Sequence, residues 1–96
     1  MSDIRYEWDE LKNIANMKKH GISFEEAVTA FADENLMIMS DEDHSDDEER
    51  FIILGLSKNT GLLVVCHCYR ESDEVIRIIS ARKATKTEDK LYRGVL

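Results

Sequence analysis

The sequence predicts a single α+β domain in which helices pack on one face of an antiparallel sheet. Two helical patterns precede residue 36, and four strand patterns then follow one another without an intervening helix. Consecutive strands joined by short breaks favour antiparallel neighbours. The chain has 96 residues, 43% of them apolar, with no proline and no internal repeat, as expected of one core. We therefore expect one domain over residues 1–96, in the order β-α-α-β-β-β-β-α.

The first strand and helix are predicted near the N-terminus. Residues 4–8 alternate apolar and charged side chains, as a short half-buried strand does. Asp9 is typical of a helix N-cap, and Gly21 of the residue that ends a helix. Apolar residues recur between them at helical spacing, a pattern typical of a packed helix face. The remaining face of this helix is expected to carry Lys12, Asn16, Lys19 and His20.

The second helix is predicted to begin after Ser23, with Glu26 completing a capping box. Its apolar stripe is formed by Phe24, Ala27, Val28, Ala30 and Phe31. Strands are expected at residues 36–39 and 51–56, separated by an acidic loop at 41–49. Thr85 is predicted to cap a last short helix that carries Leu91 and Tyr92.

Residues 62–84 predict a hairpin of two strands rich in valine and isoleucine, joined by a polar break at 71–73. If those three residues form the loop, His67 lies opposite Arg77. Opposed residues share one face of a sheet, with Cβ atoms roughly 5 Å apart. With Arg70 and Arg82 at the strand ends, this pattern predicts a cationic patch on a rigid support.

The charge is unevenly distributed. Residues 41–49 hold seven acids and no Lys or Arg, which accounts for the whole net charge of −7. From residue 50 onward, nine Lys and Arg face five Asp and Glu. The C-terminal half is therefore basic, and the negative total does not exclude a nucleic-acid substrate.

Several other functions are disfavoured by what the sequence lacks. It has no apolar run of 18 residues and no signal-peptide pattern at its start, so we expect no membrane association. Cys66 and Cys68 are expected to be reduced thiols of a cytosolic protein. In a strand His67 points away from both cysteines, so the three do not form one zinc site. No glycine-rich phosphate loop or serine nucleophile motif is present.

Three separated blocks of the sequence resemble the BrnT family of toxins. The first block contains Trp8, Asp9, Lys12, Asn16, Lys19, His20, Gly21, Phe24, Glu26 and Ala27. The second contains His44, Ser45, Glu48, Arg50, Phe51, Gly55 and Ser57. The third is the run IRIISARKAT at residues 76–85, followed by Tyr92. The resemblance spans residues 4–92 in register, although the acidic run at 41–47 is denser than the family pattern.

This resemblance implies a RelE-like ribonuclease fold and the role of a toxin in a type II toxin–antitoxin system. Such toxins act on RNA in the cytoplasm without metal or other cofactor, and they arrest growth. A cognate antitoxin, usually a ribbon-helix-helix protein and here expected to be BrnA-like, holds them in a hetero-oligomer. DNA is then contacted only through the antitoxin, whose complex represses its own operon.

RNA cleavage without a metal needs a base, an acid and cations that stabilise the charged transition state. Arginine suits the last role because its planar fork holds two phosphate oxygens and stays charged. We therefore predict Arg70, Arg77 and Arg82 as catalytic residues; the alternative for each is a surface ion pair. His67 would supply acid or base, unless it is simply packed.

The other candidates have equally plain alternatives. Glu49, or Glu48 beside it, would act as a general base, or belong to a solvated loop. Lys12 and Lys19 would bind RNA phosphates or be solvated, and His20 would join them or only interact with the helix dipole. Tyr92 would stack on a base or pack in the core.

A second function of a different class is open at this point. The chain would then be a non-catalytic binding module that acts with an antitoxin in operon autoregulation. The acidic run favours this alternative, because it repels phosphate and is suited to a basic segment of a partner.

Overall fold

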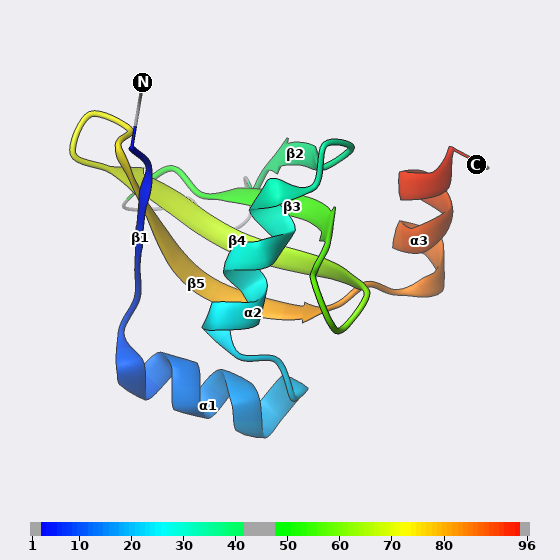
Figure 1. Cartoon of the computed structure of the whole chain (residues 1–96), viewed down its shortest axis with the longest axis horizontal. Coiled ribbons are helices and arrows are strands. Elements are labelled where there is room, and N and C mark those ends of the chain that lie inside the picture. The colour runs from blue at the N-terminus through cyan, green and yellow to red at the C-terminus, as the bar shows by residue number, and fades with distance from the viewer. Residues whose placement is uncertain (1–2, 42–47, 95–96) are drawn as a thin grey trace.

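The computed structural model describes residues 3–41 and 48–94, and its elements follow the predicted order. Five strands form one sheet, with α2 lying across it, α1 below it and α3 at its right-hand end (Figure 1). The α+β class is confirmed. The elements are β1 (Arg5–Glu7), α1 (Glu10–His20), α2 (Phe24–Thr29), a 3-10 turn η1 (Ala30–Ala32), β2 (Met37–Ser40), β3 (Phe51–Leu56), β4 (Leu62–Arg70), β5 (Val75–Lys83) and α3 (Lys86–Arg93).

The strands lie in the order β1-β5-β4-β3-β2. The last four in the sequence are antiparallel neighbours, as their consecutive patterns predict. β1 instead joins the far edge of the sheet and runs parallel to β5, with Glu7 beside Arg77. Residues 42–47, which carry most of the predicted acidic loop, lie outside the described residues.

The predicted register of the β4–β5 hairpin is wrong. Its turn has four residues, closed by a hydrogen bond from the Glu74 amide to the Glu71 carbonyl at 3.2 Å. A bulge then leaves Ile79 without a partner, since Cys66 pairs with Ser80 and His67 with Ile78. The longer turn alone places Arg77 opposite Cys68, so the side chains of His67 and Arg77 point to opposite faces of the sheet.

The main core lies between α2 and the sheet. Phe24, Ala27 and Ala30 pack on inward-facing residues of β3, β4 and β5, and all three are fully buried. At Gly55 the sheet and η1 come so close that a Cβ atom would lie 2.7 Å from the Ala30 carbonyl oxygen. A second, smaller cluster is formed by Leu54, Leu62 and Val64, on which Tyr92 of α3 packs.

Helix α1 is attached to the domain through asparagines. The Asn16 side chain donates to the Ala81 carbonyl at 2.8 Å and accepts from the Ala81 amide at 3.1 Å. Asn13 accepts from the Phe24 amide at 2.8 Å. Both asparagines are buried, whereas Leu11 is 78% exposed. The expectations that Asn16 shares an outer face with Lys12 and that the apolar residues pack inward are therefore wrong.

The capping box predicted for α2 is only half formed. Ser23 accepts from the Glu26 amide at 3.0 Å, but the Glu26 carboxylate does not return to Ser23. It accepts instead from the amides of Asn59 and Thr60, at 2.6 and 3.0 Å. Glu26 therefore ties α2 to the β3–β4 turn. The complete capping box is at the start of α3, between Thr85 and Glu88.

Candidate functional site

Arg70 and Arg77 share the face of the sheet that lies away from α2. Arg77 is opposite Cys68, and Arg70 lies two residues beyond Cys68 on β4, so the three side chains point the same way. The other face carries Val65 and Ile78, which belong to the main core. The strand pairing therefore brings together two of the predicted catalytic arginines.

Glu7 contacts both of these arginines. Its Oε2 accepts from Arg77 Nη1 at 2.7 Å and lies 3.9 Å from Arg70 Nε. Arg70 Nη2 also donates to Glu48 Oε2 at 3.1 Å. The hydrogen bond that Arg77 donates to Glu7 raises the pKa of Arg77 further above its ordinary value, so this guanidinium stays charged. The sequence alone did not identify Glu7 or Glu48 as a contact of these arginines.

Arg82 lies further along the same face, opposite Val64 on β4. Its two Nη atoms donate to the two carboxylate oxygens of Glu88, both at 2.8 Å. This fork holds the pKa of Glu88 down at about 2. The partners of Arg77 and Arg82 on β4 are Cys68 and Val64, so the two arginines are separated by roughly 13 Å along the strand.

A cavity of about 260 Å³ opens between Arg82 and Arg50 on this face. Arg50 directly precedes β3 and is a candidate that our sequence reasoning did not include among the catalytic residues. Its place in the second block of the family resemblance was the signal that could have identified it, and the pairing of Phe51 with His67 now places it beside the arginines of β4 and β5. The cavity is lined by Asp41, Arg50, Ile52, Val64, Cys66, Ile79, Ser80 and Arg82.

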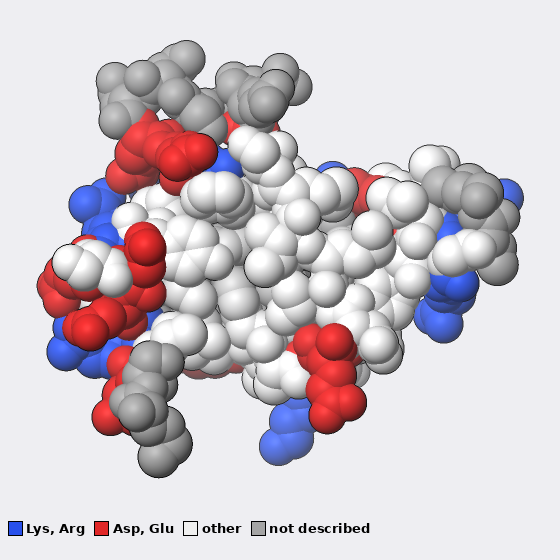
Figure 2. Space-filling view, turned by 90° about the horizontal axis from the view of Figure 1, so that it is seen from above, with Lys and Arg blue, Asp and Glu red and all other residues white. Residues whose placement is uncertain are grey.

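We call Arg50, Arg70, Arg77 and Arg82 the arginine face. Carboxylates from β1, α3 and the residues before β3 are interleaved with it, so its positive charge is partly offset. Figure 2 shows acidic and basic side chains intermingled at the left-hand end of the molecule, with few charges in the middle of the view. An RNA phosphate would have to displace carboxylates to contact Arg70, Arg77 or Arg82.

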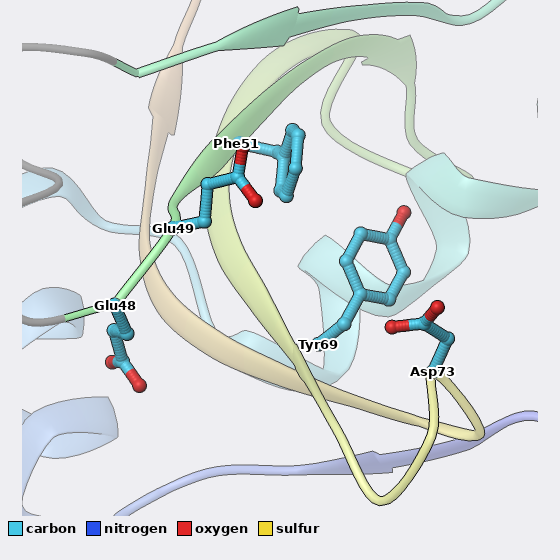
Figure 3. Close-up of a pocket in the computed structure, with 5 residues that line it drawn as sticks. All are labelled: Glu48, Glu49, Phe51, Tyr69 and Asp73. Carbon is cyan, nitrogen blue, oxygen red and sulfur yellow. The ribbon is translucent and has the colours of Figure 1, made fainter.

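Glu49 lies in a separate, acidic pocket of about 390 Å³. Figure 3 shows the rings of Phe51 and Tyr69 as its apolar walls, with Asp73 beside Tyr69. Glu48, Glu49 and Asp73 also line it, and none of its described lining residues is basic. Burial, followed by the charge of Asp73, raises the pKa of Tyr69. The structure thus gives an arginine partner to Glu48, whereas Glu49 faces a pocket that repels phosphate.

His67 is fully buried on the α2 side of the sheet, away from the arginine face. Its ring centroid lies 4.9 Å from that of Phe31 and 5.4 Å from that of Tyr69. Burial lowers the pKa of His67, so the imidazole is neutral at neutral pH. Its Nε2 has no hydrogen-bond partner within the described structure. This placement gives it no access to a substrate.

Tyr92 joins α3 to the rest of the fold. Its hydroxyl donates to the Asp33 carboxylate, which also accepts from the Leu56 amide at 2.8 Å. The hydrogen bond with Asp33 raises the pKa of Tyr92. Its ring packs on the smaller cluster. These contacts match the packing alternative for this residue.

Lys12, Lys19 and His20 belong to α1 and not to the arginine face. Both lysines are exposed, and His20 is partly exposed in the last turn of the helix. Neither lysine lines the cavity beside Arg82 or the acidic pocket beside Glu49. The structure thus places these three residues on a helix, whereas the predicted catalytic arginines lie on strands of the sheet.

The two cysteines offer neither a nucleophile nor a metal site. Burial is the main cause that raises the pKa of Cys66 to about 11, and its thiol donates to Asp41 at 3.6 Å. Cys68 lies opposite Arg77 in the sheet and is buried, and burial raises the pKa of its thiol as well. Over residues 3–41 and 48–94, no three His, Cys, Asp or Glu side chains are grouped to hold a metal ion. No helix within those ranges is long and apolar enough to cross a membrane.

Comparison with known proteins identifies the family. A family model described as the ribonuclease toxin BrnT of type II toxin–antitoxin systems matches residues 8–88. The fold is similar to the crystal structure of the Brucella abortus ribonuclease toxin BrnT, with a TM-score of 0.60 and 23% identity over 86% of this chain and 99% of that one. No curated protein matches the chain. The chain belongs to the BrnT family of ribonuclease toxins of type II toxin–antitoxin systems.

Proposed function

We propose that this chain is a metal-independent endoribonuclease that cleaves mRNA in the cytoplasm and is neutralised by a cognate antitoxin. The antitoxin would be a ribbon-helix-helix protein of the BrnA type in a hetero-oligomer, and it would make the only contact with operon DNA. The observation that supports this most is the arginine face. It gathers four cations on one side of the sheet, where the pairing of β4 with β5 positions Arg70, Arg77 and Arg82, and Arg50 lines a cavity with Arg82.

The proposed reaction begins when the ribose 2′-hydroxyl attacks the adjacent phosphorus. The P–O5′ bond then breaks, leaving a 2′,3′-cyclic phosphate and a 5′-hydroxyl that gains a proton. Negative charge grows on the non-bridging oxygens during attack, and a guanidinium fork can hold two of them. Arg70 and Arg77 are suited to this task because both reach the same Glu7 carboxylate oxygen. We propose that the phosphate takes the place of that oxygen.

The carboxylates that the phosphate displaces are the candidates for the general base. Glu7 and Glu48 contact Arg77 and Arg70, whereas Glu49 lies in the acidic pocket. A carboxylate displaced by a few ångströms stays within reach of the 2′-hydroxyl proton. We therefore propose Glu7 or Glu48 in this role, in place of Glu49 and the buried His67.

The decisive experiment is induction of this chain alone in a bacterial host, with RNA followed by primer extension. The wild-type chain should arrest growth and produce discrete new 5′ ends. Arg77→Ala should lower cleavage by about 100-fold or more, because one donor to the transition state is lost. Arg77→Lys should recover only part of this loss, since lysine lacks the bidentate fork.

The matched control is Arg93→Ala, which removes another arginine paired with an acid, Asp89, but on the surface of α3. It should remain as toxic as the wild type. Cleavage by the purified protein should also persist in EDTA. Full toxicity of both Arg77→Ala and Arg82→Ala would show that the arginine face is not the catalytic site.

A non-catalytic binding module is the second candidate, because carboxylates already engage Arg70, Arg77 and Arg82. In that case the arginine face would be a structural network. Soluble wild-type protein that causes neither arrest nor cleavage, yet binds the antitoxin, would favour this function.

A further inference from the structure

The outer face of α1 carries an apolar stripe that no part of the described structure covers. The stripe consists of Leu11, Ile14, Ala15 and Met17: Ile14 and Ala15 follow Leu11 by three and four residues, and Met17 follows Ile14 by three. Leu11 is 78% exposed, Ile14 42% and Met17 40%. An exposed apolar stripe on a helix is typical of an interaction surface.

The stripe faces outward because polar side chains fix the rotation of α1. Asn16 forms two hydrogen bonds to the backbone of Ala81, and Asn13 binds the backbone of Phe24. These contacts lie on the side of α1 that faces β5 and α2. The opposite side, around Leu11, therefore points into solvent. Rotating α1 to bury its apolar residues would break these buried hydrogen bonds.

Three lysines adjoin the stripe. Lys12 and Lys19 follow one flank of the helix, and Lys18 lies one turn beyond Ile14, in line with the stripe. Within the described residues none of the three forms an ion pair, unlike Arg70, Arg77 and Arg82. Their charge is thus available to a partner. A basic flank beside an apolar stripe complements a helix with apolar and acidic residues in the same arrangement.

We propose that the outer face of α1 is the docking site for an acidic amphipathic helix of a partner protein. This rests on the proposed function in one respect, since we identify that partner as the antitoxin. The partner helix would place apolar side chains over Leu11 and Ile14 and carboxylates against Lys12 and Lys19. The lysines predicted to bind RNA would then serve protein recognition instead.

Other occupants fit the same surface less well. RNA would gain contacts from the lysines but none from Leu11 and Ile14, because a phosphate backbone does not favour apolar side chains. A second copy of this chain packed on the same stripe would bring its own lysines close to these lysines. The acidic helix alone complements both the apolar residues and the charge.

The test uses the full chain with Leu11 and Ile14 both changed to serine, and the antitoxin cloned from the operon that encodes it. Both positions are exposed, so the variant should keep the fold, checked by its thermal unfolding. By isothermal titration calorimetry, the double variant should bind the antitoxin at least about tenfold more weakly. In cells it should arrest growth as the wild type does, but co-expressed antitoxin should no longer relieve the arrest.

Two further variants separate surface chemistry from general damage. Ile38→Ser removes an apolar side chain of the edge strand β2 that is 57% exposed, and it should bind the antitoxin as the wild type does. Lys12→Glu with Lys19→Glu should weaken binding at low salt, and the loss should shrink as salt screens the charges.

The outcomes are distinct from those that test the proposed function. Wild-type affinity and full rescue of the Leu11→Ser, Ile14→Ser variant would overturn the docking site. Loss of RNA binding or of toxicity in that variant would assign the stripe to RNA and also overturn it. A wild-type dimer that this variant converts to a monomer, with unchanged antitoxin affinity, would assign it to self-association. A non-toxic wild-type chain would contradict the proposed function, while the calorimetric comparison would still decide the docking site.

Discussion

His67 shows how a single residue is constrained by its place in the sheet. Three aromatic rings surround it, and its imidazole has no exposed surface. Its folded-state pKa is lowered by burial, whereas in the unfolded chain it titrates near 6.5. The unfolded state therefore takes up a proton first as the pH falls. The stability that the neutral imidazole contributes is complete above pH 6.5 and is lost below it.

Replacing His67 with leucine tests this directly. At pH 7.5 the free energy of unfolding should change by less than about 1.5 kcal/mol, since a similar volume is retained and an unpaired nitrogen is removed. Between pH 6.5 and 5, the variant should lose less stability than the wild type, as measured by urea unfolding. Toxicity should be retained. A His67→Leu protein that is stable but inactive would show that His67 takes part in catalysis.

The sequence identified the arginines and His67 as candidates, but it did not show to which face of the sheet the side chain of His67 points. Arg70, Arg77 and Arg82 were identified because arginines are unusual within apolar strands, and the structure places them on one face. The predicted pairing of His67 with Arg77 failed because the turn between the strands has four residues and not three. A one-residue change in register moves a side chain to the other face of the sheet, and the local sequence did not distinguish the two turn lengths.

Among the elements, the link between α2 and the β3–β4 turn depends on one carboxylate. Glu26 accepts hydrogen bonds from two backbone amides and from the side-chain amide of Asn59, which hold its pKa at about 2. Because the folded-state pKa is depressed, this contribution is complete above the ordinary carboxyl pKa near 4.5. It is lost as the pH falls from 4.5 towards 2.

Glu26→Gln should lower the free energy of unfolding at pH 7 by about 1–2 kcal/mol, because an uncharged acceptor binds the two amides less strongly. Near pH 2 the variant and the wild type should unfold at similar denaturant concentrations. Glu34→Gln, at an exposed site after η1, should have no such effect. An unchanged midpoint for Glu26→Gln at pH 7 would refute the role of this contact.

The helices were located correctly because capping residues and apolar spacing are local signals. Their packed faces were harder to predict. α2 packs through its apolar stripe as its sequence indicates. α1 packs through Asn13 and Asn16, whose partners Phe24 and Ala81 are set by tertiary structure. Periodicity identifies an apolar face, but it does not show whether this domain or another molecule covers it.

At the scale of the whole molecule, the balance of charge opposes the proposed substrate. The net charge of −7 equals that of residues 41–49, and the arginine face is partly neutralised by carboxylates. Long-range repulsion of RNA should therefore be strongest at low ionic strength, where screening is weak.

Changing Asp43, Asp46 and Asp47 to asparagine should strengthen RNA binding at low salt. The gain should fade as salt is raised through the range where the Debye length falls below about 10 Å. Fluorescence anisotropy with a labelled single-stranded RNA measures the affinity at low salt and its change as salt is raised. An affinity that is equal to the wild type at every salt concentration would show that these charges lie far from the RNA path.

The order of elements was enough to predict the fold class. It did not predict which edge of the sheet β1 joins. A three-residue strand has too little pattern to select a neighbour, and its parallel partner lies 70 residues away. That pairing sets Glu7 beside Arg77, a contact that short-range reasoning does not reach.

This pairing also fixes when the arginine face can assemble during synthesis. β5 precedes α3 and follows the other strands in the sequence. The cluster of Glu7, Arg70 and Arg77 is therefore incomplete until β5, which carries Arg77, has been synthesised. A nascent chain still lacking β5 has neither the sheet edge that β1 needs nor the assembled arginine face. Under the proposed function, cleavage of RNA therefore requires that β5 has been synthesised and has joined the sheet.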